Sequence, residues 1–437
     1  MHVMIEPRPL TVWLLQTGEP LHVDSGKARP MRAMNLADAL VSAGHRVVVW
    51  SSAFYHQQRR QRVHTYTSVT IGDRLEYRLV PSPGYQRNIG PGRLWDHAVL
   101  GRNLARILDR EASPPDVGFI GFPPIEPAAV MARWLRNRGV PSLLDVKDQW
   151  PAIFTDPLPG VLRPVGRVAL APYFALARRA MHDATGIAAM ADGMLAWALA
   201  FAGRLRGPHD TIAPLTSALE EPESESISAA HAWWDALGVR RDARPRLCFV
   251  GSQTSSFDFA TVASAARSLA ARDGGSPCDF VICGTGESGA LWRTEAAGLS
   301  NVIFPGWIDA AQLHVLADRS AGFLAPYTDN ENFASSLPNK VLDALALGLP
   351  ILSPLGGEVA ALLHREGVGI RYLPGSAASL ISAVDRLLAH DGMRGKLSAN
   401  ARVLYNARFT FEAVYGGLVQ HLEKLASYQA NGTSDRR

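Results

Sequence analysis

Along most of the chain, short apolar runs alternate with longer segments whose apolar residues recur at the spacing of an amphipathic helix. In the first half, the runs that predict strands are residues 11–15, 46–50, 117–121, 142–146 and 186–189. The segments between them that predict helices are residues 31–43, 94–108, 127–138 and 172–182. Regular alternation of strands and helices predicts a parallel sheet that is covered by helices on both faces.

The same pattern begins again after a segment rich in glutamate and serine, residues 220–228. Further strands are predicted at 246–250, 279–283, 302–304, 322–325, 350–353 and 369–372, and further helices at 229–237, 259–271, 289–297, 310–317, 338–347, 358–364 and 376–389. We therefore expect an α/β protein with two Rossmann-like, doubly wound domains that face a central cleft. The expected division is 1–217 for the first domain, 218–245 for an acidic linker with a short helix, 246–410 for the second domain, 411–428 for a helix that crosses back, and 429–437 for a disordered tail.

The composition is that of a folded globular protein, with 47% apolar and 19% charged residues, and 437 residues are too many for one ordinary core. The three cysteines form no CxxC pair, so we expect them to be buried apolar residues and not part of a disulfide framework or a zinc site. We expect no signal peptide and no membrane-spanning run, and hence a cytoplasmic protein. The net charge of +4 suits an anionic small molecule or an anionic membrane surface, whereas the absence of a basic stripe with aromatics disfavours nucleic acid.

The most informative segment is residues 323–350, where a buried strand is followed by a polar loop and then a helix. We expect this helix to begin near Pro338, with Ser335 or Ser336 at its N-cap. Its first turn is suited to an anion, and Lys340 would bind a diphosphate there. Asp343, one turn later, would accept hydrogen bonds from ribose hydroxyls. The alternative is that Lys340 and Asp343 form an ordinary surface pair at i,i+3 spacing.

This segment resembles the C-terminal signature of glycosyltransferase family 4, in particular the WbuB-type bacterial surface-polysaccharide subgroup. The resemblance implies a GT-B fold, a nucleotide-sugar donor and retention of anomeric configuration. Family members carry two glutamates here, and this chain has Ser335 at the first position and Asp343 at the second. The contact with the donor sugar would then come from Glu331 or Asn332. The run Leu337-Pro338-Asn339-Lys340 resembles the version found in the subgroup, and these residues with Ser336 are expected at the donor site.

Three further loops of the second half resemble donor-binding loops of the family. Gly251 and Ser252 follow the first strand, and Gly284 and Gly286 follow the second; a tight strand-to-helix turn explains the second pair equally well. The segment that contains Trp307 and Ile308 resembles the loop that holds the base, although Trp307 could instead pack in the core. Residues 253–258 lack the cations common in the family, so we expect Lys340 or an arginine of the first domain to replace them.

In the first domain, a basic loop that contains Gly26, Lys27, Arg29 and Arg32 resembles the family's N-terminal loop and suits a phosphate-bearing acceptor such as a lipid diphosphate. A solvated loop is the alternative. His56 follows the second strand and also resembles the subgroup. Asp148 lies in a segment that resembles Asp-x-Arg-Asp-x-Trp-Pro and would orient or deprotonate the acceptor hydroxyl, unless it caps the following turn.

The sequence thus predicts a retaining hexosyl- or aminohexosyltransferase of bacterial surface-polysaccharide, lipopolysaccharide or glycolipid biosynthesis, with Asp148 and Lys340 as catalytic residues. No metal or other cofactor is expected, because the chain has no Asp-x-Asp motif. The expected partners are the nucleotide-sugar donor and a lipid-linked or saccharide acceptor, with peripheral contact at the inner face of the cytoplasmic membrane through residues 160–180 unless these pack in the core. The alternatives are a nucleotide-sugar 2-epimerase and a non-catalytic subunit of a polysaccharide assembly complex. A dehydrogenase is disfavoured because no GxGxxG follows the first strand.

Overall fold

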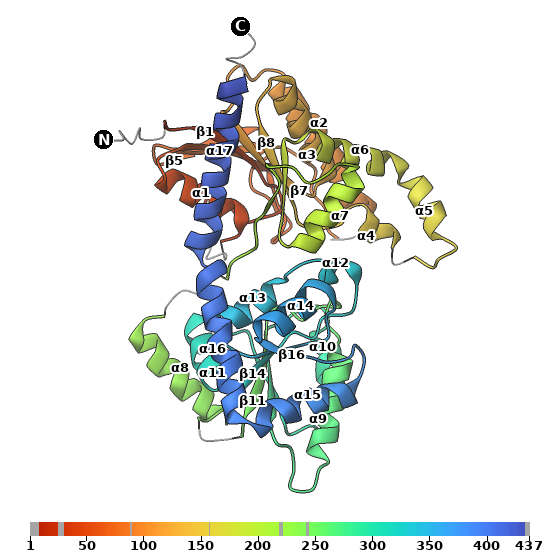
Figure 1. Ribbon diagram of the computed structural model, residues 1–437, viewed down its shortest axis with the longest axis vertical. Helices are drawn as coiled ribbons and strands as arrows, with labels where there is room; N and C mark the ends of the chain where they lie inside the picture. Colours follow the sequence, from red (N-terminus) through yellow and green to blue (C-terminus); the bar gives the residue numbers. More distant parts are fainter. Residues whose placement is uncertain are drawn as a thin grey trace. The chain divides into compact units, whose positions relative to one another are not determined.

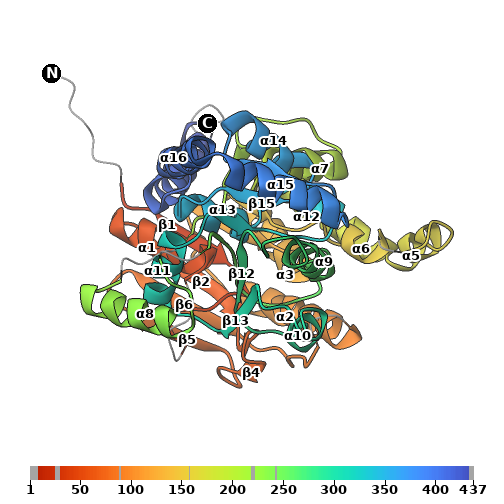
Figure 2. The same cartoon turned by 90° about the horizontal axis from the view of Figure 1, so that it is seen from below.

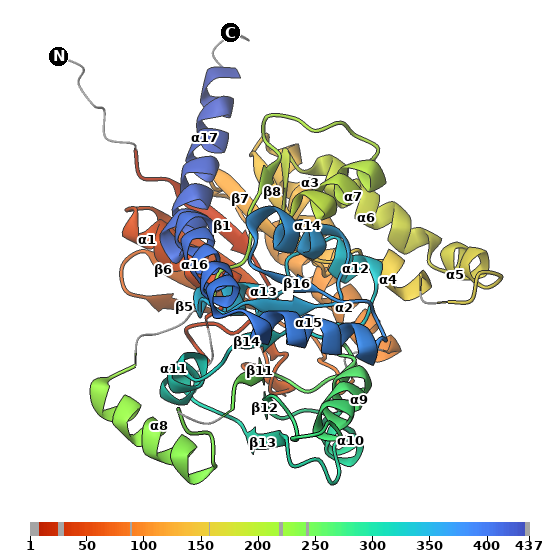
Figure 3. The same ribbon diagram turned by 60° about the horizontal axis from the view of Figure 1, so that its bottom comes forward.

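The computed structural model, seen from three directions in Figures 1, 2 and 3, describes residues 8–24, 30–87, 90–156, 158–217, 222–241 and 244–432. The chain forms two compact units. Unit 1 consists of Met1–Pro214 and Phe411–Arg437, and unit 2 is Leu215–Thr410. Among the described helices, none is both long enough and apolar enough to cross a membrane.

Unit 1 is built on an eight-stranded sheet with the order β10-β9-β8-β7-β1-β2-β6-β5. Its strands are β1 (Thr11–Leu15), β2 (Arg46–Ser52), β5 (Thr67–Ile71), β6 (Leu75–Val80), β7 (Val117–Phe122), β8 (Ser142–Val146), β9 (Gly186–Ala189) and β10 (Thr211–Ile212). All neighbouring strands run parallel except β5 and β6, which form an antiparallel hairpin at one edge. A small separate hairpin joins β3 (Phe54–Tyr55) to β4 (Arg60–Gln61).

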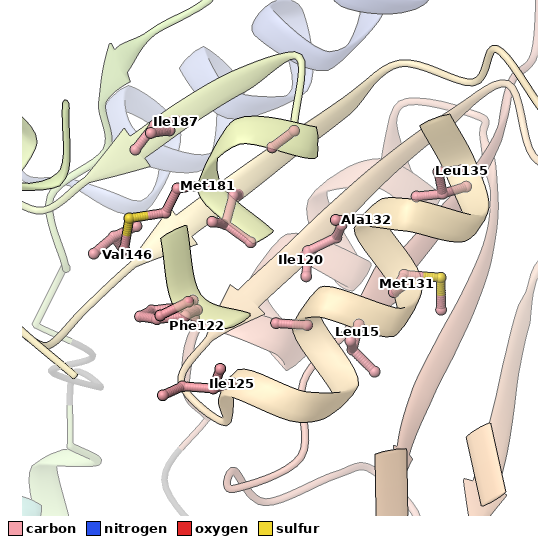
Figure 4. Close-up of a cluster of buried hydrophobic side chains, with 14 of the residues drawn as sticks. Leu15, Ile120, Phe122, Ile125, Met131, Ala132, Leu135, Val146, Met181 and Ile187 are labelled. Atoms are coloured by element: carbon pink, nitrogen blue, oxygen red, sulfur yellow. The ribbon is translucent and has the colours of Figure 1, made fainter. Parts of the chain in front are cut away.

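Helices cover both faces of this sheet. Successive side chains of a strand point to opposite faces, and because both sets are apolar here, both faces need to be buried. The helical elements are α1 (Arg32–Ser42), α2 (Pro91–Leu108), α3 (Ile125–Asn137), α4 (Ala152–Thr155), α5 (Arg163–Ala169), α6 (Ala171–Asp183), α7 (Asp192–Ala202), the π-helical turn η1 (Glu412–Gly416) and α17 (Gly417–Gly432). Val12 and Leu14 of β1 lie in a core cluster with α1 and α17. Trp13 and Leu15 lie in the opposite cluster with α2, α3, α6 and α7, part of which is shown in Figure 4. Both faces are therefore buried, as in other parallel sheets.

Unit 2 contains a second sheet, in which all six strands run parallel with the order β13-β12-β11-β14-β15-β16. Its strands are β11 (Arg246–Val250), β12 (Asp279–Cys283), β13 (Val302–Gly306), β14 (Gly322–Leu324), β15 (Ile351–Ser353) and β16 (Gly369–Arg371). Its helices are α8 (Ser224–Ala236), α9 (Phe259–Ala270), α10 (Gly289–Glu295), α11 (Ala310–Asp318), α12 (Glu331–Ala334), α13 (Asn339–Ala346), α14 (Gly357–Glu366), α15 (Ala377–Ala389) and α16 (Asp391–Arg408). Figures 2 and 3 show α9 and α10 on one side of β11–β13 and α11 on the other.

The expected α/β fold with two doubly wound sheets is confirmed. The three cysteines are free and buried, as predicted, and burial raises the pKa of the Cys248 and Cys278 thiols to about 12. At the end of the chain, α17 continues to Gly432, four residues into the segment predicted as a tail, and residues 433–437 lie outside the described residues.

Candidate functional site

Three neighbouring strands of unit 2 end side by side, and each ends at or just before a glycine with positive φ. These glycines are Gly251 after β11, Gly284 after β12 and Gly306 at the end of β13, with φ of 138°, 110° and 88°. The Gly284 amide donates to the Gly306 carbonyl at 2.6 Å. A Cβ atom on Gly284 would lie 2.1 Å from the Gly251 carbonyl oxygen. The main chains thus approach so closely that side chains are excluded, and the carboxyl edge of the sheet is lined by backbone.

Lys340 reaches this edge from the first turn of α13. Its side chain is buried, and Nζ donates to the Val250 carbonyl at 2.5 Å. The ammonium also lies 4.6 Å from the ring centroid of Phe249 and 5.2 Å from that of Phe257, so two aromatic faces help to hold it in a low-dielectric site. A Cβ atom on Gly251 would lie 1.9 Å from Nζ. A cation at the positive end of a helix dipole, directly beside a glycine turn, is an arrangement that suits a bound anion.

Asp343 lies one turn further along α13, where its Oδ1 accepts a 2.6 Å hydrogen bond from the Ser217 hydroxyl. The Ser217 carbonyl in turn accepts from the Tyr405 hydroxyl at 2.8 Å, which fixes the segment that carries Ser217. Lys340 is buried at the sheet edge, so the alternative of an ordinary surface pair between Lys340 and Asp343 is wrong.

The start of α13 differs from the prediction. Pro338 occupies the N-cap position, and a separate short helix, α12, precedes it. Ser335 and Ser336 both donate their hydroxyls back to the Asn332 carbonyl, at 3.2 Å and 3.1 Å, so neither caps α13. The serines serve the end of α12 because the chain turns between the two helices and Pro338 already sets an extended N-cap backbone.

The remaining residues predicted around this loop take several positions. Glu331 is exposed in the first turn of α12, whereas Asn332 is half-buried. Leu337 is buried and anchors the segment between the helices, and Asn339 is exposed at the first residue of α13. These four residues thus lie on one short segment, residues 331–339, that leads from α12 into the turn holding Lys340.

Gln253 was not predicted as a site residue, yet its hydrogen bonds connect the loop after β11 with the loop after β12. Its amide donates to the Thr285 carbonyl and its carbonyl accepts from the Ser288 amide, both at 3.0 Å, while its Nε2 donates to the Gly284 carbonyl. A Cβ atom on Gly286 would lie 2.2 Å from the Gln253 carbonyl oxygen, which accounts for the second glycine of this loop. A polar residue in a loop is unremarkable in sequence, so no pattern marks its burial.

The third loop presents an aromatic surface. Trp307 follows Gly306 directly and is 72% exposed, whereas the next residue, Ile308, is buried. The alternative that Trp307 packs in the core is therefore wrong. Because Gly306 is bonded to Gly284, the exposed indole lies within the same group of loops as Gly251 and Lys340.

Unit 1 has a pocket of about 190 Å³ at the corresponding edge of its own sheet. The loops after β1, β2, β7 and β8 and one side of α2 form its wall. The polar residues that line it are Gln16, Thr17, Glu19, Ser52, His56, Tyr85, Arg93, Asp96, His97, Lys147 and Asp148. Two residues predicted for the acceptor side, His56 and Asp148, are thus brought together, although 92 positions (148 − 56) separate them in the sequence.

A network of charged side chains, most of them buried, lies at this pocket. Glu19 accepts hydrogen bonds from the Gln16 side chain at 2.6 Å, from the Lys147 ammonium, and from the Ala33 amide at the start of α1 at 2.7 Å. Arg32 lies beside this network, with its Nε 3.0 Å from Asp145 and its Nη2 donating to the Ala213 carbonyl.

The prediction that Arg32 offers its charge to a phosphate is corrected by this geometry. Both Arg32 and Asp145 are buried, because Arg32 belongs to the first turn of α1, which packs on the sheet, and not to a loop. Burial raises the pKa of Asp145, an effect that Arg32 and Lys147 partly offset. Gly26, Lys27 and Arg29 lie outside the described residues.

The histidines of the pocket are held neutral by their surroundings. The Tyr85 hydroxyl and the His56 Nδ1 are 2.6 Å apart, and the His97 ring lies between those of Tyr85 and Trp150. Burial, reinforced by Arg93, lowers the pKa of His97 to about 3 and also lowers the pKa of His56. Asp96, also missed in the sequence, has a pKa raised by burial although Gly84 donates to it. The adjacent Asp96-His97 pair, on the helix predicted at residues 94–108, is a sequence signal that could have marked this wall of the pocket.

Residues 244–390 match the protein family described as Glycosyl transferases group 1. This range contains the whole six-stranded sheet of unit 2 and every loop described at its edge. A comparison with curated proteins gave no match.

Solved structures resemble nearly the whole chain. Sucrose-phosphate synthase from Thermosynechococcus elongatus superimposes with a TM-score of 0.68 at 15% identity, covering 96% of this chain and 99% of that one. WaaG, a glycosyltransferase involved in lipopolysaccharide biosynthesis, gives 0.63 at 15% identity over 94% and 99%. HepE from Anabaena, in complex with UDP, gives 0.60 at 14% identity over 95% and 99%. At these identities the likeness establishes the fold, which is GT-B.

Proposed function

We propose that this protein is a retaining glycosyltransferase that moves a hexosyl or aminohexosyl group from a nucleoside-diphosphate sugar to an acceptor hydroxyl. The observation that carries the proposal is the buried ammonium of Lys340, beside the Gly251 turn and in the first turn of α13. Because the leaving group is a diphosphate, the chemical task is to stabilise negative charge as it develops there. A preorganised cation and a helix N-terminus supply that stabilisation without a metal ion.

The other residues of unit 2 take roles around the diphosphate. The glycine turns at Gly251 and Gly284 let main-chain amides approach the phosphates, and Asp343 accepts hydrogen bonds from the ribose hydroxyls. Trp307 stacks on the base, since an exposed indole offers a flat apolar surface for it. The donor sugar contacts Glu331 or Asn332, because Ser335 is committed to the end of α12.

The acceptor occupies the pocket of unit 1, where Asp148 orients or deprotonates its hydroxyl. The pocket contains both cationic and acidic side chains, and neutral histidines beside aromatic rings, which suits a saccharide. WaaG acts in lipopolysaccharide biosynthesis, and we propose a similar setting, with a lipid-linked or saccharide acceptor at the inner face of the cytoplasmic membrane.

The test measures nucleotide binding by calorimetry, with UDP as the first probe because HepE was crystallised with UDP, and ADP and GDP as comparisons. Lys340→Met keeps the length of the side chain and removes its charge. A charged hydrogen bond contributes about 1.5–3 kcal/mol, so the dissociation constant should rise by about ten- to a hundredfold. Lys396→Met, at an exposed lysine of α16, is the matched control and should bind nucleotide like the parent protein.

Two results separate the proposal from its alternatives. Conversion of a nucleotide sugar into an epimer without any acceptor would indicate a 2-epimerase. Tight nucleotide binding that leads to no transfer on any saccharide or lipid-linked acceptor would indicate a non-catalytic subunit. If Lys340→Met binds UDP, ADP and GDP with the parent affinities, Lys340 does not bind the diphosphate and the proposal loses its basis.

A further inference from the structure

A groove is open at the surface of unit 1, where α3 packs between α2 and α6. Its volume is about 220 Å³, and the residues that line it are different from those of the acceptor pocket. Small residues leave room for it, namely Ala98, Gly101 and Ala105 on α2 and Ala129 on α3. A Cβ atom on Gly101 would lie 2.9 Å from the Cβ atom of Glu126, so α2 and α3 are in close contact at the floor.

The third wall of the groove is α6, which contributes Leu176 and Arg179. Within residues 160–180, α6 packs in the core through Ala177 and Ala180, which agrees with the core-packed interpretation of this segment. That interpretation is wrong for α5, which has no buried residue. Because α2, α3 and α6 all pack in the core, the groove belongs to the fold of unit 1 and not to a loop.

Each of the three walls brings one arginine to the groove. Arg102, Arg133 and Arg179 are exposed, and no residue in the described ranges forms a hydrogen bond or ion pair with their guanidinium groups. Glu126, which also lines the groove, instead accepts a 2.8 Å hydrogen bond from the Tyr173 hydroxyl. Like charges around one groove repel one another, so the groove favours an occupant that carries negative charge.

The lining limits which kind of anionic occupant fits. Apart from its charged residues, the groove is lined by alanine, glycine, valine and leucine, so the hydroxyls of a saccharide would find few hydrogen-bond partners there. The lining residues recur at i, i+3, i+4 and i+7 on both α2 and α3, which spans about 10 Å, or two turns of a helix. A helix that has a face of small side chains and acidic residues at one end matches this shape and charge.

Helix α8 of unit 2 has such a face. Its Trp234 is buried, and the indole Nε1 donates to the Gln312 carbonyl of α11 at 2.8 Å; Figures 2 and 3 show α8 beside α11. The opposite side of α8 is exposed and has small residues at helical spacing after one acid: Glu225, Ser228, Ala229, Ala232 and Ala236.

The charge of α8 is opposite to that of the groove. Residues 215–239 contain no lysine or arginine. Asp235 pairs with Arg319 of the same unit at 2.7 Å. Glu223 and Glu225, at the start of the helix, are exposed and have no partner in the part of the chain that the structure describes. Their charges are therefore available to another molecule.

We propose that α8 of one copy of this protein docks into the groove of a second copy, so that the protein self-associates. The glutamates at the start of α8 pair with the arginines of the groove, and the alanines let the helices approach closely. The contact is heterologous, because a surface of unit 2 meets a surface of unit 1. The inference does not depend on the proposed glycosyl transfer, since neither surface belongs to the candidate nucleotide site or to the acceptor pocket.

The experiment is analytical ultracentrifugation of the full-length protein at low and at high salt. One helix in a groove is a small interface, so association should appear in the micromolar range, and the measurement extends to about 100 µM. The parent protein should associate at low salt and dissociate at high salt, because exposed charges form the rim of the contact.

Two charge-reversed variants test whether these two surfaces meet. The groove variant combines Arg102→Glu with Arg133→Glu, and the helix variant combines Glu223→Arg with Glu225→Arg. Each changes exposed positions only, so the fold should be kept, and each alone should associate at least about tenfold more weakly than the parent. A mixture of the two should associate again, because the acidic α8 of the groove variant then meets the unchanged groove of the helix variant.

A neutral variant and a control complete the set. Ala232→Tyr adds bulk to the exposed face of α8 without changing its charge and should also weaken association. Arg365→Glu combined with Arg386→Glu makes the same change of net charge as the groove variant, at exposed arginines of α14 and α15. This control should associate like the parent protein.

The proposal is overturned if the parent protein is a monomer throughout, or if a mixture of the two reversed variants stays monomeric. It is also overturned if a monomeric parent binds oligogalacturonate and the groove variant does not, because the groove would then hold an acidic saccharide. UDP binding, measured on the same variants, should be unchanged. A failure here is therefore distinguishable from a failure of the proposed transfer.

Discussion

The two units are both built on a largely parallel sheet, but side chains form the carboxyl edge of the sheet in unit 1 and main chain forms it in unit 2. In unit 1 the edge carries interacting side chains, in which Glu19 bonds Lys147 and Arg32 lies against Asp145. In unit 2 the edge carries glycines whose main chains touch, with the amide of Gly284 bonded to Gly306. A network of side chains should lose stability when one charge is removed. A surface made of closely packed main chain should instead be disrupted when one carbon atom is added. The comparison can be tested with single substitutions of these two kinds.

The largest effect is expected from Arg32→Met in unit 1. The substitution leaves Asp145 buried without its neighbouring guanidinium, and breaking a buried ion pair costs about 3–5 kcal/mol of unfolding free energy. Urea denaturation at pH 7 measures this loss. Adding Asp145→Asn removes the stranded charge, so the double variant should recover at least half of it. A double variant as unstable as the single one would show that the charge of Asp145 is not the cause.

The same variant has a predictable pH dependence. Burial already raises the pKa of Asp145 in the parent protein, and loss of Arg32 raises it further. The folded state then binds a proton more tightly than the unfolded state, whose aspartate has a pKa of about 3.9. The deficit of Arg32→Met relative to the parent protein should therefore be smallest in acid and grow as the pH rises through the folded pKa. A deficit relative to the parent protein that is the same at pH 5 and pH 7 would contradict this.

In unit 2 the corresponding change is Gly284→Ala. The new Cβ meets the Gly251 carbonyl oxygen at a position where φ is 110°, so we expect a loss of about 2–3 kcal/mol together with loss of UDP binding. Gly298→Ala is the control, because Gly298 also has positive φ but open space around it. That control should cost about 1 kcal/mol and leave binding intact. Equal losses in the two variants would mean that backbone strain, and not contact between the loops, matters at Gly284.

Much of the fold could be predicted because buried parallel strands are continuous apolar runs. β1, β8 and β9 have the bounds expected from the sequence, and so do β11 and β12. The edge hairpin β5–β6 was not predicted, because neither strand is a continuous apolar run: both alternate polar and apolar residues, and β5 is half-exposed. Helix α16 was missed because it buries only Ala401 and Leu404 among its 18 residues, which leaves little helical periodicity.

The candidate site of unit 2 could be predicted from the sequence more fully than that of unit 1. Main-chain features of unit 2 could be predicted, because Gly251 and Gly284 follow predicted strands in segments that resemble the family's donor-binding loops. The side-chain network of unit 1 was not visible, because pairing depends on which strands are neighbours. In the sequence, Arg32 looks like part of a basic loop. Only the packing of α1 on the sheet brings it to Asp145, which is 113 positions (145 − 32) away.

The smallest effect is expected at Asp343, a carboxylate of α13 in the unit 2 site. Ser217→Ala removes the hydroxyl that donates to Oδ1 at 2.6 Å and thereby loosens the orientation of the carboxylate. One hydrogen bond contributes about 0.5–1.5 kcal/mol, so UDP affinity should fall by about two- to tenfold. The loss should be smaller for 2′-deoxy-UDP, because the missing hydroxyl is one that Asp343 would bind.

Calorimetry with both nucleotides measures this difference, and Ser268→Ala on the exposed side of α9 is the control. An equal loss for the two nucleotides would show that Ser217 supports the fold of the loop and not recognition of the ribose. A loss confined to UDP would instead assign Asp343 to the ribose, and would show that an oriented side chain acts there beside the main-chain loops. The Ser217–Asp343 pair of unit 2 would then resemble the Arg32–Asp145 pair of unit 1, because each is a side-chain contact that positions a carboxylate. The two pairs would differ in that Asp343 binds a ligand, whereas Asp145 is buried in the protein.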